Sequence, residues 1–398
     1  MSIKKTLIKN STYNIAGYIY LAIASLISIP ILLKSLDTEL FGSYILFSGL
    51  VVLAATFDFG LSQATIRWLS LPTSTPKERL SIWQTSIFLF STIAIFLSFL
   101  TFSIFIFFLR DLPGFKLLTD QQFFLSSLAS SLIIFVNLLN TCFLTIPQSD
   151  QRFDIYNTRT IIVGTGNTIL TALFSIKFPV IHLILLFQLL FHLVTLLTII
   201  GYAKQKFSTK ALIPKYNSEI TKKLLGFGLK NFTTNIANQS RVQFSNYALG
   251  GMLSGTAVTA FSIPQNLIIK AAGGISQLTL ALFPLSTQLS SRERFPKLKR
   301  LIIQLEVVVL LLGMLQVFIV YQYGDLILLW WLKDAGLVIV ATKVLKILSW
   351  FFLLTVLTPI PSVIFESLNY PQIPAFFATT NTIITLILIF YLVPNYGS

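Results

Sequence analysis

The chain is 398 residues long; 55% of its residues are hydrophobic and 11% are charged. A soluble protein of this length cannot bury that much apolar surface, so the composition excludes a soluble enzyme and indicates a membrane protein. The formal net charge of +15 would suit a nucleic-acid partner. However, the basic residues lie in short loops between apolar runs, which is the positive-inside pattern, and we therefore expect membrane lipid and no nucleic acid as a partner.

About eleven apolar stretches approach the ~20 residues that a helix needs to cross a bilayer. Lipid offers the backbone no hydrogen-bond partners, so each stretch is predicted to be a helix. Asp325–Leu332, with its paired tryptophans, is predicted to be an interfacial stretch before the tenth span. The predicted spans are 12–33, 41–63, 82–109, 122–146, 160–177, 179–202, 224–248, 256–283, 300–322, 340–366 and 372–393.

The loop charges predict an orientation. With the N-terminus in the cytoplasm, 20 of the 29 Lys and Arg residues fall on the cytoplasmic side and 7 outside. Arg159 is counted among the cytoplasmic loop cations, and Arg241 and Lys270 remain within spans. This bias predicts a multi-pass protein of the cell (inner) membrane with a cytoplasmic N-terminus.

An internal repeat predicts two parallel halves. Lys9–Ala16 read KNSTYNIA and Lys230–Ala237 read KNFTTNIA, which agree at six of eight positions with an offset of 221. The offset covers six predicted spans, an even number, so both halves have the same orientation. We expect an all-α membrane protein with a six-helix bundle in 1–205, a basic cytoplasmic linker in 206–223 and a C-terminal bundle of about five helices in 224–398, around a central cavity. By the same offset a twelfth span would end near position 423, so the last helix is expected to be missing.

Charged side chains within the predicted spans are the candidates for function, because burying charge in lipid is costly. The seventh span is the most polar and places its amides with Arg241 on one half of the helix. Such a stripe either joins helices by hydrogen bonds or lines a cavity, and the unpaired Arg241 favours the cavity. The stripe includes Asn235 and Asn238.

Lys270 lies near the middle of the eighth span, after Pro264, which is predicted to break the helix. One interpretation is that Arg241 and Lys270 form a cationic site for an anion. The alternative is a structural ion pair between these cations and Asp58 or Glu306. Both acids are candidates for coupling or gating, although pairing of Asp58 with Arg67 at the cytoplasmic mouth is the preferred interpretation for that residue.

No enzyme chemistry is visible in the sequence. Cys142 is the single cysteine, so neither a disulfide nor a cysteine metal site can be built. His182 and His192 are ten residues apart on one predicted helix, about 80° apart around it, which argues against a metal pair. There is no nucleotide-binding glycine loop and no long outside loop that would hold a catalytic domain. We expect no enzyme, no cofactor and no metal.

Several short motifs together resemble one family. They are Asn10 and Tyr13, Pro30, LFGSY at Leu40–Tyr44, DFGL at Asp58–Leu61, TAFSIP at Thr259–Pro264, and VPNYG at Val393–Gly397. The chain is similar, over nearly its whole length, to the polysaccharide flippases (O-antigen and capsule exporters) of the multidrug/oligosaccharidyl-lipid/polysaccharide export superfamily.

The resemblance implies that a polyprenyl-diphosphate-linked oligosaccharide is moved from the cytoplasmic to the outer leaflet for surface polysaccharide synthesis, with glycan polymerase machinery as a partner. It also implies that basic cavity residues hold the diphosphate, and Arg241 and Lys270 match that role. An alternative is a multidrug/cation antiporter of the same superfamily, whose cavity should be acidic. A membrane glycan polymerase is a further alternative, but it would need a catalytic loop that is not visible.

Overall fold

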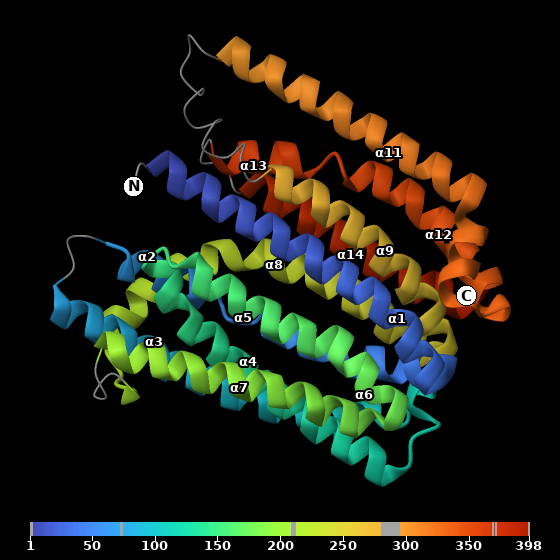
Figure 1. The fold of residues 1–398 in the computed structure, drawn as a ribbon, viewed down its shortest axis with the longest axis horizontal. Coiled ribbons are helices and arrows are strands. Elements are labelled where there is room, and N and C mark those ends of the chain that lie inside the picture. The colour runs from blue at the N-terminus through green and yellow to red at the C-terminus, as the bar shows by residue number, and fades with distance from the viewer. Residues whose placement is uncertain are drawn as a thin grey trace.

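The computed structural model describes residues 3–71, 75–207, 212–279, 295–367, 370 and 372–396. Within these ranges the chain forms helices joined by short turns, and none of the described residues forms a strand. The helices run broadly along one direction (Figure 1). The all-α prediction is confirmed.

The first helix, α1 (Ile3–Ala55), contains the first two predicted spans. Its helical trace is interrupted at Asp37, where φ is 61° and ψ is 165°. A positive φ is uncommon for a residue other than glycine, and here it separates two helical segments within one element. The interruption falls between the first predicted span, which ends at position 33, and the second, which begins at position 41.

Capping residues define where several of the following helices begin. Thr75 and Glu78 form a capping box at the start of α3, and Thr119 and Gln122 form one at the start of α4. Each box satisfies amide groups that would otherwise lack partners at a helix N-terminus. The elements are α2 (Leu61–Leu69), α3 (Pro76–Ile104), a π-helical turn (Phe105–Leu109), a 3-10 turn (Pro113–Phe115), α4 (Asp120–Ser149), α5 (Phe153–Thr165), a second π-helical turn (Gly166–Leu170), α6 (Thr171–Lys177) and α7 (Ile181–Phe207).

Aromatic side chains fill the interior among these helices. The rings of Phe105 and Phe115 each lie 4.9 Å from that of Phe47, and all three side chains are fully buried. Trp83 is buried elsewhere in this region and stacks on Phe207 of α7 at 6.0 Å. Helix α4 packs against both α3 and α7, and these buried rings contribute to the packing of the helices in this region.

The remainder of the chain forms a second group of long helices. The side chain of Asn217 accepts hydrogen bonds from the amides of Glu219 and Ile220 and so caps α8. Helix α14 packs on α8, and α12 packs on both α9 and α11. The elements are α8 (Ser218–Met252), α9 (Gly255–Thr279), α11 (Phe295–Leu332), α12 (Ala335–Thr355), α13 (Pro359–Ser367) and α14 (Gln372–Tyr396).

The outer surface of the molecule is suited to lipid. Eight helical stretches among the described residues are long and apolar enough to cross a membrane. One of them, Ala16–Ala55, includes the break at Asp37 and corresponds to two predicted spans. Large apolar side chains such as Phe107 and Leu197 are 77% and 69% exposed. A surface of this kind requires a lipid environment, so the chain is a multi-pass membrane protein.

Four predicted details differ in the structure. The fifth span begins at Phe153 rather than at position 160, because α5 starts directly after a short turn. Trp330 and Trp331 lie in the last turn of the continuous α11 rather than in a separate interfacial stretch. Pro264 lies inside α9 and does not end it. The predicted tenth span is divided before Pro359, where α13 starts, as expected for a residue without an amide hydrogen.

Helix α1 lies beside both groups of helices, between α5 and α9 in the view of Figure 1. The hydroxyl of Tyr18 donates a hydrogen bond to the carbonyl of Lys270 in α9 at 2.7 Å. The indole of Trp331 donates to the carbonyl of Leu26 at 2.8 Å. Contacts therefore cross the boundary between the predicted halves, and the division into 1–205, 206–223 and 224–398, with its parallel bundles, stays a prediction.

Candidate functional site

Arg241 lies in the middle of α8 and reaches α12. Its guanidinium carbon is 5.0 Å from the centre of the Phe351 ring, a cation–π arrangement. Its Nη1 atom is buried and has no hydrogen-bond partner. No ion pair within the described ranges involves Arg241. The side chain therefore keeps an unsatisfied positive charge inside the helical assembly.

Lys270 lies on α9, where that helix packs against α1. Its backbone carbonyl accepts the hydrogen bond from Tyr18, and its side chain is partly buried. Its ammonium group forms no ion pair with an acid in the part of the chain that the structure describes. Both cations of the predicted site are thus without a carboxylate partner, on two helices that pack against each other.

Asp58 has a local structural role. Its carboxylate accepts hydrogen bonds from the amide of Gly60 at 2.8 Å, the amide of Ser62 at 3.2 Å and the Ser62 hydroxyl, and so caps the start of α2. The predicted pairing of Asp58 with Arg67 is wrong. Positive φ angles at Phe59 and Gly60 turn the backbone so that the Asp58 carboxylate accepts hydrogen bonds from nearby amides. The Arg67 guanidinium instead lies over the Phe227 ring, 4.4 Å from its centre.

Glu306 lies on α11, which packs chiefly on α12. Its side chain is partly buried and its Oε1 atom has no hydrogen-bond partner. It forms no ion pair with Arg241, Lys270 or any other described cation. Its predicted coupling or gating role stays a prediction.

The polar stripe of α8 joins helices at one end. Asn246 is buried, and its side-chain oxygen accepts a hydrogen bond from the Ser262 hydroxyl of α9 at 2.8 Å, so this end of the stripe joins helices. Gln239 remains partly exposed near Arg241. The backbones of Asn235 and Asn238 lie within α8, but their side chains lie outside the described part of the structure.

A second polar cluster lies between α4, α5 and α7, and the sequence interpretation missed it. Arg159 was assigned to a loop, yet its side chain is 6% exposed, and its Nη2 donates to Asn140 at 3.0 Å. Asn140 in turn donates to the carbonyl of His192, whose ring contacts the amide of Asn167 at 3.1 Å. The error follows from the late predicted start of the fifth span; the start of α5 at Phe153 places Arg159 inside a helix.

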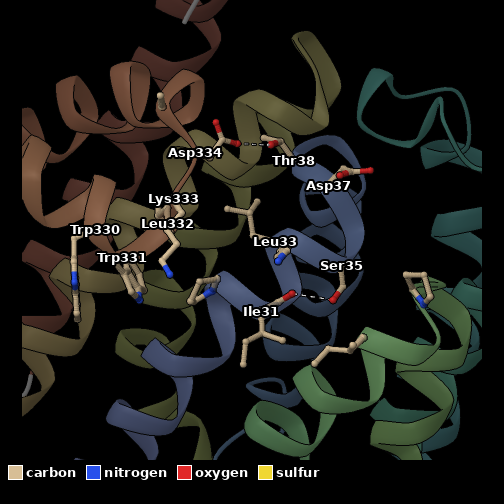
Figure 2. A pocket seen from close by; sticks show the side chains of 15 residues that line it. Ile31, Leu33, Ser35, Asp37, Thr38, Trp330, Trp331, Leu332, Lys333 and Asp334 are labelled. Atoms are coloured by element: carbon tan, nitrogen blue, oxygen red, sulfur yellow. Dashed lines mark hydrogen bonds between the residues drawn. The ribbon is translucent and has the colours of Figure 1, made fainter.

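A groove of about 1370 Å³ opens where the break in α1 faces the junction of α11 and α12 (Figure 2). Trp330 and Trp331 lie on one wall, and Thr38 and Asp334 meet at the top, where the threonine hydroxyl approaches the carboxylate at 3.4 Å. Both Asp37 and Lys333 have positive φ angles, of 61° and 57°. Under the predicted orientation this groove lies on the outer side of the membrane.

A smaller cavity of about 470 Å³ lies at the opposite end, between the starts of α3 and α8. Lys223 and Glu219 of α8 line it and form an ion pair at 2.6 Å. The Lys223 ammonium holds the pKa of the Glu219 carboxyl below its usual value. These opposite charges in the cavity lining neutralise each other. Arg241 and Lys270, by contrast, have no acidic partner among the described residues.

The amino-acid sequence matches a known protein family over most of its length. The model of the family described as "Polysaccharide biosynthesis protein" matches residues 7–290. The chain is 26% identical over 398 residues to a putative O-antigen transporter of Shigella flexneri, covering 98% of this chain and 92% of that relative.

Solved structures with the same fold are transporters and a flippase. An inward-facing multidrug resistance MATE family transporter of the MOP superfamily aligns with a TM-score of 0.71 at 15% identity, over 98% of this chain and 88% of that one. The lipid II flippase MurJ in an inward closed conformation aligns with a TM-score of 0.71 at 15% identity, over 98% and 82%. A MOP superfamily transporter from Pyrococcus furiosus aligns with a TM-score of 0.65 at 16% identity, over 99% and 89%. The chain therefore belongs to the polysaccharide biosynthesis protein family and has the fold of the MOP superfamily.

Proposed function

We propose that this protein is a flippase that moves a polyprenyl-diphosphate-linked oligosaccharide from the cytoplasmic to the outer leaflet of the inner membrane. The observation that carries the proposal is the pair of unneutralised cations, Arg241 on α8 and Lys270 on α9. A diphosphate supplies the negative charge that both lack, because Arg binds phosphate bidentately and Lys binds it as a point charge. Family membership and the resemblance to an O-antigen transporter support the same substrate class.

A multidrug/cation antiporter is the second candidate, since MATE transporters share the fold. A cationic drug would require acidic groups in the cavity. Asp58 is committed to capping α2, which leaves Glu306 as a described acid without a partner inside a predicted span. Arg241 and Lys270, both without an acidic partner among the described residues, therefore favour an anionic substrate.

The proposal includes a cytoplasmic N-terminus and cooperation with the glycan polymerase machinery that uses the flipped product. The predicted loop charges support the orientation. The start of α1 and the end of α14 also lie at opposite ends of the helices (Figure 1), as expected for termini on opposite sides of the membrane.

Deletion of the gene tests the proposal. The deletion strain should lose surface glycan and accumulate lipid-linked oligosaccharide that stays in the inner leaflet, inaccessible to a glycosidase added outside the inner membrane. The wild-type chain should restore export, and ethidium efflux should be unchanged. Normal surface glycan together with reduced ethidium efflux in the deletion strain would contradict the flippase function and support the antiporter function.

A further inference from the structure

A groove of about 330 Å³ separates α5 from α7 on the surface of the molecule. Arg159 lines it from α5, together with Thr158 and Ile162, and Thr198 and Tyr202 line it from α7. Ile162 is 43% exposed, and the neighbouring Leu197 is 69% exposed. Apolar side chains with this exposure face lipid in a membrane protein, so the groove opens toward the bilayer.

Arg159 is a buried charge whose hydrogen-bonding capacity is largely unused. The side chain is 6% exposed, and its Nη2 donates to the Asn140 side chain at 3.0 Å. Its Nε and Nη1 atoms are buried without hydrogen-bond partners. No acid among the described residues forms an ion pair with it. A buried guanidinium without a counter-ion is costly, and an anion bound beside it would remove that cost.

The acid that lines the same groove does not supply this counter-ion. The carboxylate of Asp154 accepts hydrogen bonds from Nε and Nη2 of Arg152, at 2.9 Å and 2.8 Å. This two-point ion pair lies at the exposed start of α5. Because Asp154 is already paired, it leaves Arg159 without a counter-ion among the described residues.

The depth of Arg159 indicates which ligand. It lies six residues after the first residue of α5, which is about 9 Å along the helix axis. A long basic side chain at this depth, next to Tyr202, lies close to the level of lipid headgroups. The anion available at that level on a lipid-facing surface is a phosphate attached to a lipid.

We propose that the groove between α5 and α7 binds the phosphate of a membrane lipid, with Arg159 as the anion-binding residue. The contact with Asn140 uses one N–H group of Nη2, and a rotation of the guanidinium toward the groove lets the unused N–H groups of Nη1 donate to the phosphate. The lipid is either a phospholipid or a polyprenyl phosphate, because both present the same group. The site is separate from Arg241 and Lys270, so it stands whether or not those residues bind the transported substrate.

Lipid binding to the purified full-length protein tests this site directly. Native mass spectrometry during titration with phosphatidylglycerol should detect one lipid that stays bound to the wild type. Arg159→Gln should weaken its binding by at least tenfold, whereas Lys204→Gln, which removes an exposed cation of α7 that does not line the groove, should change it less than twofold. Diacylglycerol, which lacks phosphate, should bind weakly to all three proteins. Equal phosphatidylglycerol binding by wild type and Arg159→Gln would overturn the proposal.

A second variant covers the case in which Arg159→Gln disturbs the fold. Thr198→Phe fills the groove from α7 and leaves the arginine in place, so it should abolish the bound lipid without lowering the melting temperature. Retention of the lipid by Thr198→Phe would also overturn the proposal. Competition with polyprenyl phosphate identifies the occupant: displacement of phosphatidylglycerol assigns the site to the carrier lipid, and failure to displace it assigns the site to phospholipid.

Discussion

Gly42 and Gly255 meet backbone to backbone, so that a Cβ atom on Gly42 would lie 1.9 Å from the carbonyl oxygen of Gly255. Beside this contact, the Glu39 carboxylate accepts hydrogen bonds from the amides of Gly255 and Thr256, at 2.8 Å and 2.7 Å. The Thr259 hydroxyl donates to the carbonyl of Thr38 at 2.7 Å. The second segment of α1 is therefore held against the start of α9, where Val258 and Thr259 are fully buried.

Replacing Gly42 by alanine should open this contact, because the added carbon would collide with backbone rather than with a flexible side chain. Val258 is fully buried next to it in α9. In a background lacking Cys142, a cysteine at position 258 should react several-fold faster with a water-soluble maleimide once Gly42→Ala is present. Gly201→Ala is the control, since a Cβ there meets nothing within 4 Å. Equal reaction rates in the Gly42 and Gly201 variants would refute the role of the contact.

The opposite end of the molecule offers a matched pair of glycines on α8. A Cβ on Gly228 would lie 2.5 Å from the carbonyl oxygen of Phe59, whereas a Cβ on Gly226 would meet nothing within 4 Å. Gly228→Ala should destabilise the protein by about 1–3 kcal/mol through overpacking. Gly226→Ala should be neutral or stabilising by up to about 1 kcal/mol, because alanine favours helix. Thermal unfolding in detergent checks both, and a similar melting temperature for the two variants would contradict the close contact.

We expect the Phe351 ring to hold the Arg241 guanidinium in position by a cation–π interaction. Phe351→Leu removes the cation–π interaction, which contributes about 0.5–2 kcal/mol, while keeping an apolar side chain. Export per molecule of membrane-inserted protein should fall several-fold, and Phe351→Trp should retain most activity. Phe377→Leu, at an exposed apolar position on α14, serves as the control. Unchanged export in Phe351→Leu would show that the ring does not position the guanidinium.

The predicted orientation can be tested with single cysteines in loops. Lys333 lies between α11 and α12, and Lys215 lies just before α8. In intact cells, a membrane-impermeant thiol reagent should label a cysteine replacing Lys333 and should label one replacing Lys215 only after lysis. The reverse pattern would invert the topology.

Hydropathy and loop charge were sufficient to predict a helical multi-pass protein, because the length of an apolar run is set by bilayer thickness. Periodicity does not predict where a helix bends, so Pro264 was expected to break α9, whereas the backbone break in α1 occurs at Asp37. The position at which a helix begins or ends is also not fixed by hydropathy. A predicted start seven residues too late for the fifth span placed Arg159 in a loop and concealed the buried cluster around it.

The candidate site was predictable in part. Arg241 and Lys270 are conspicuous in the sequence because cations are rare inside spans, and their lack of an acidic partner among the described residues agrees with the cationic-site interpretation. The role of Asp58 was not predictable, since its hydrogen bonds depend on positive φ angles at Phe59 and Gly60. Charge alone cannot distinguish a helix cap from an ion-pair partner.

Arg241 and Lys270 are proposed to bind the anionic headgroup of the substrate rather than to stabilise the fold. The rival account is a structural pair with Asp58 or Glu306 in another conformation of the transport cycle. It predicts poor membrane insertion of the alanine variants and rescue when the charges of cation and acid are exchanged. The substrate account predicts normal insertion and no rescue, because the partner charge lies on the substrate.

The most direct test is glycan export normalised to membrane abundance in a deletion strain complemented with Arg241→Ala or Lys270→Ala. Each variant should be inserted at the wild-type level and should lose at least tenfold in export, with lipid-linked glycan retained in the inner leaflet. Normal export by both variants would contradict the account.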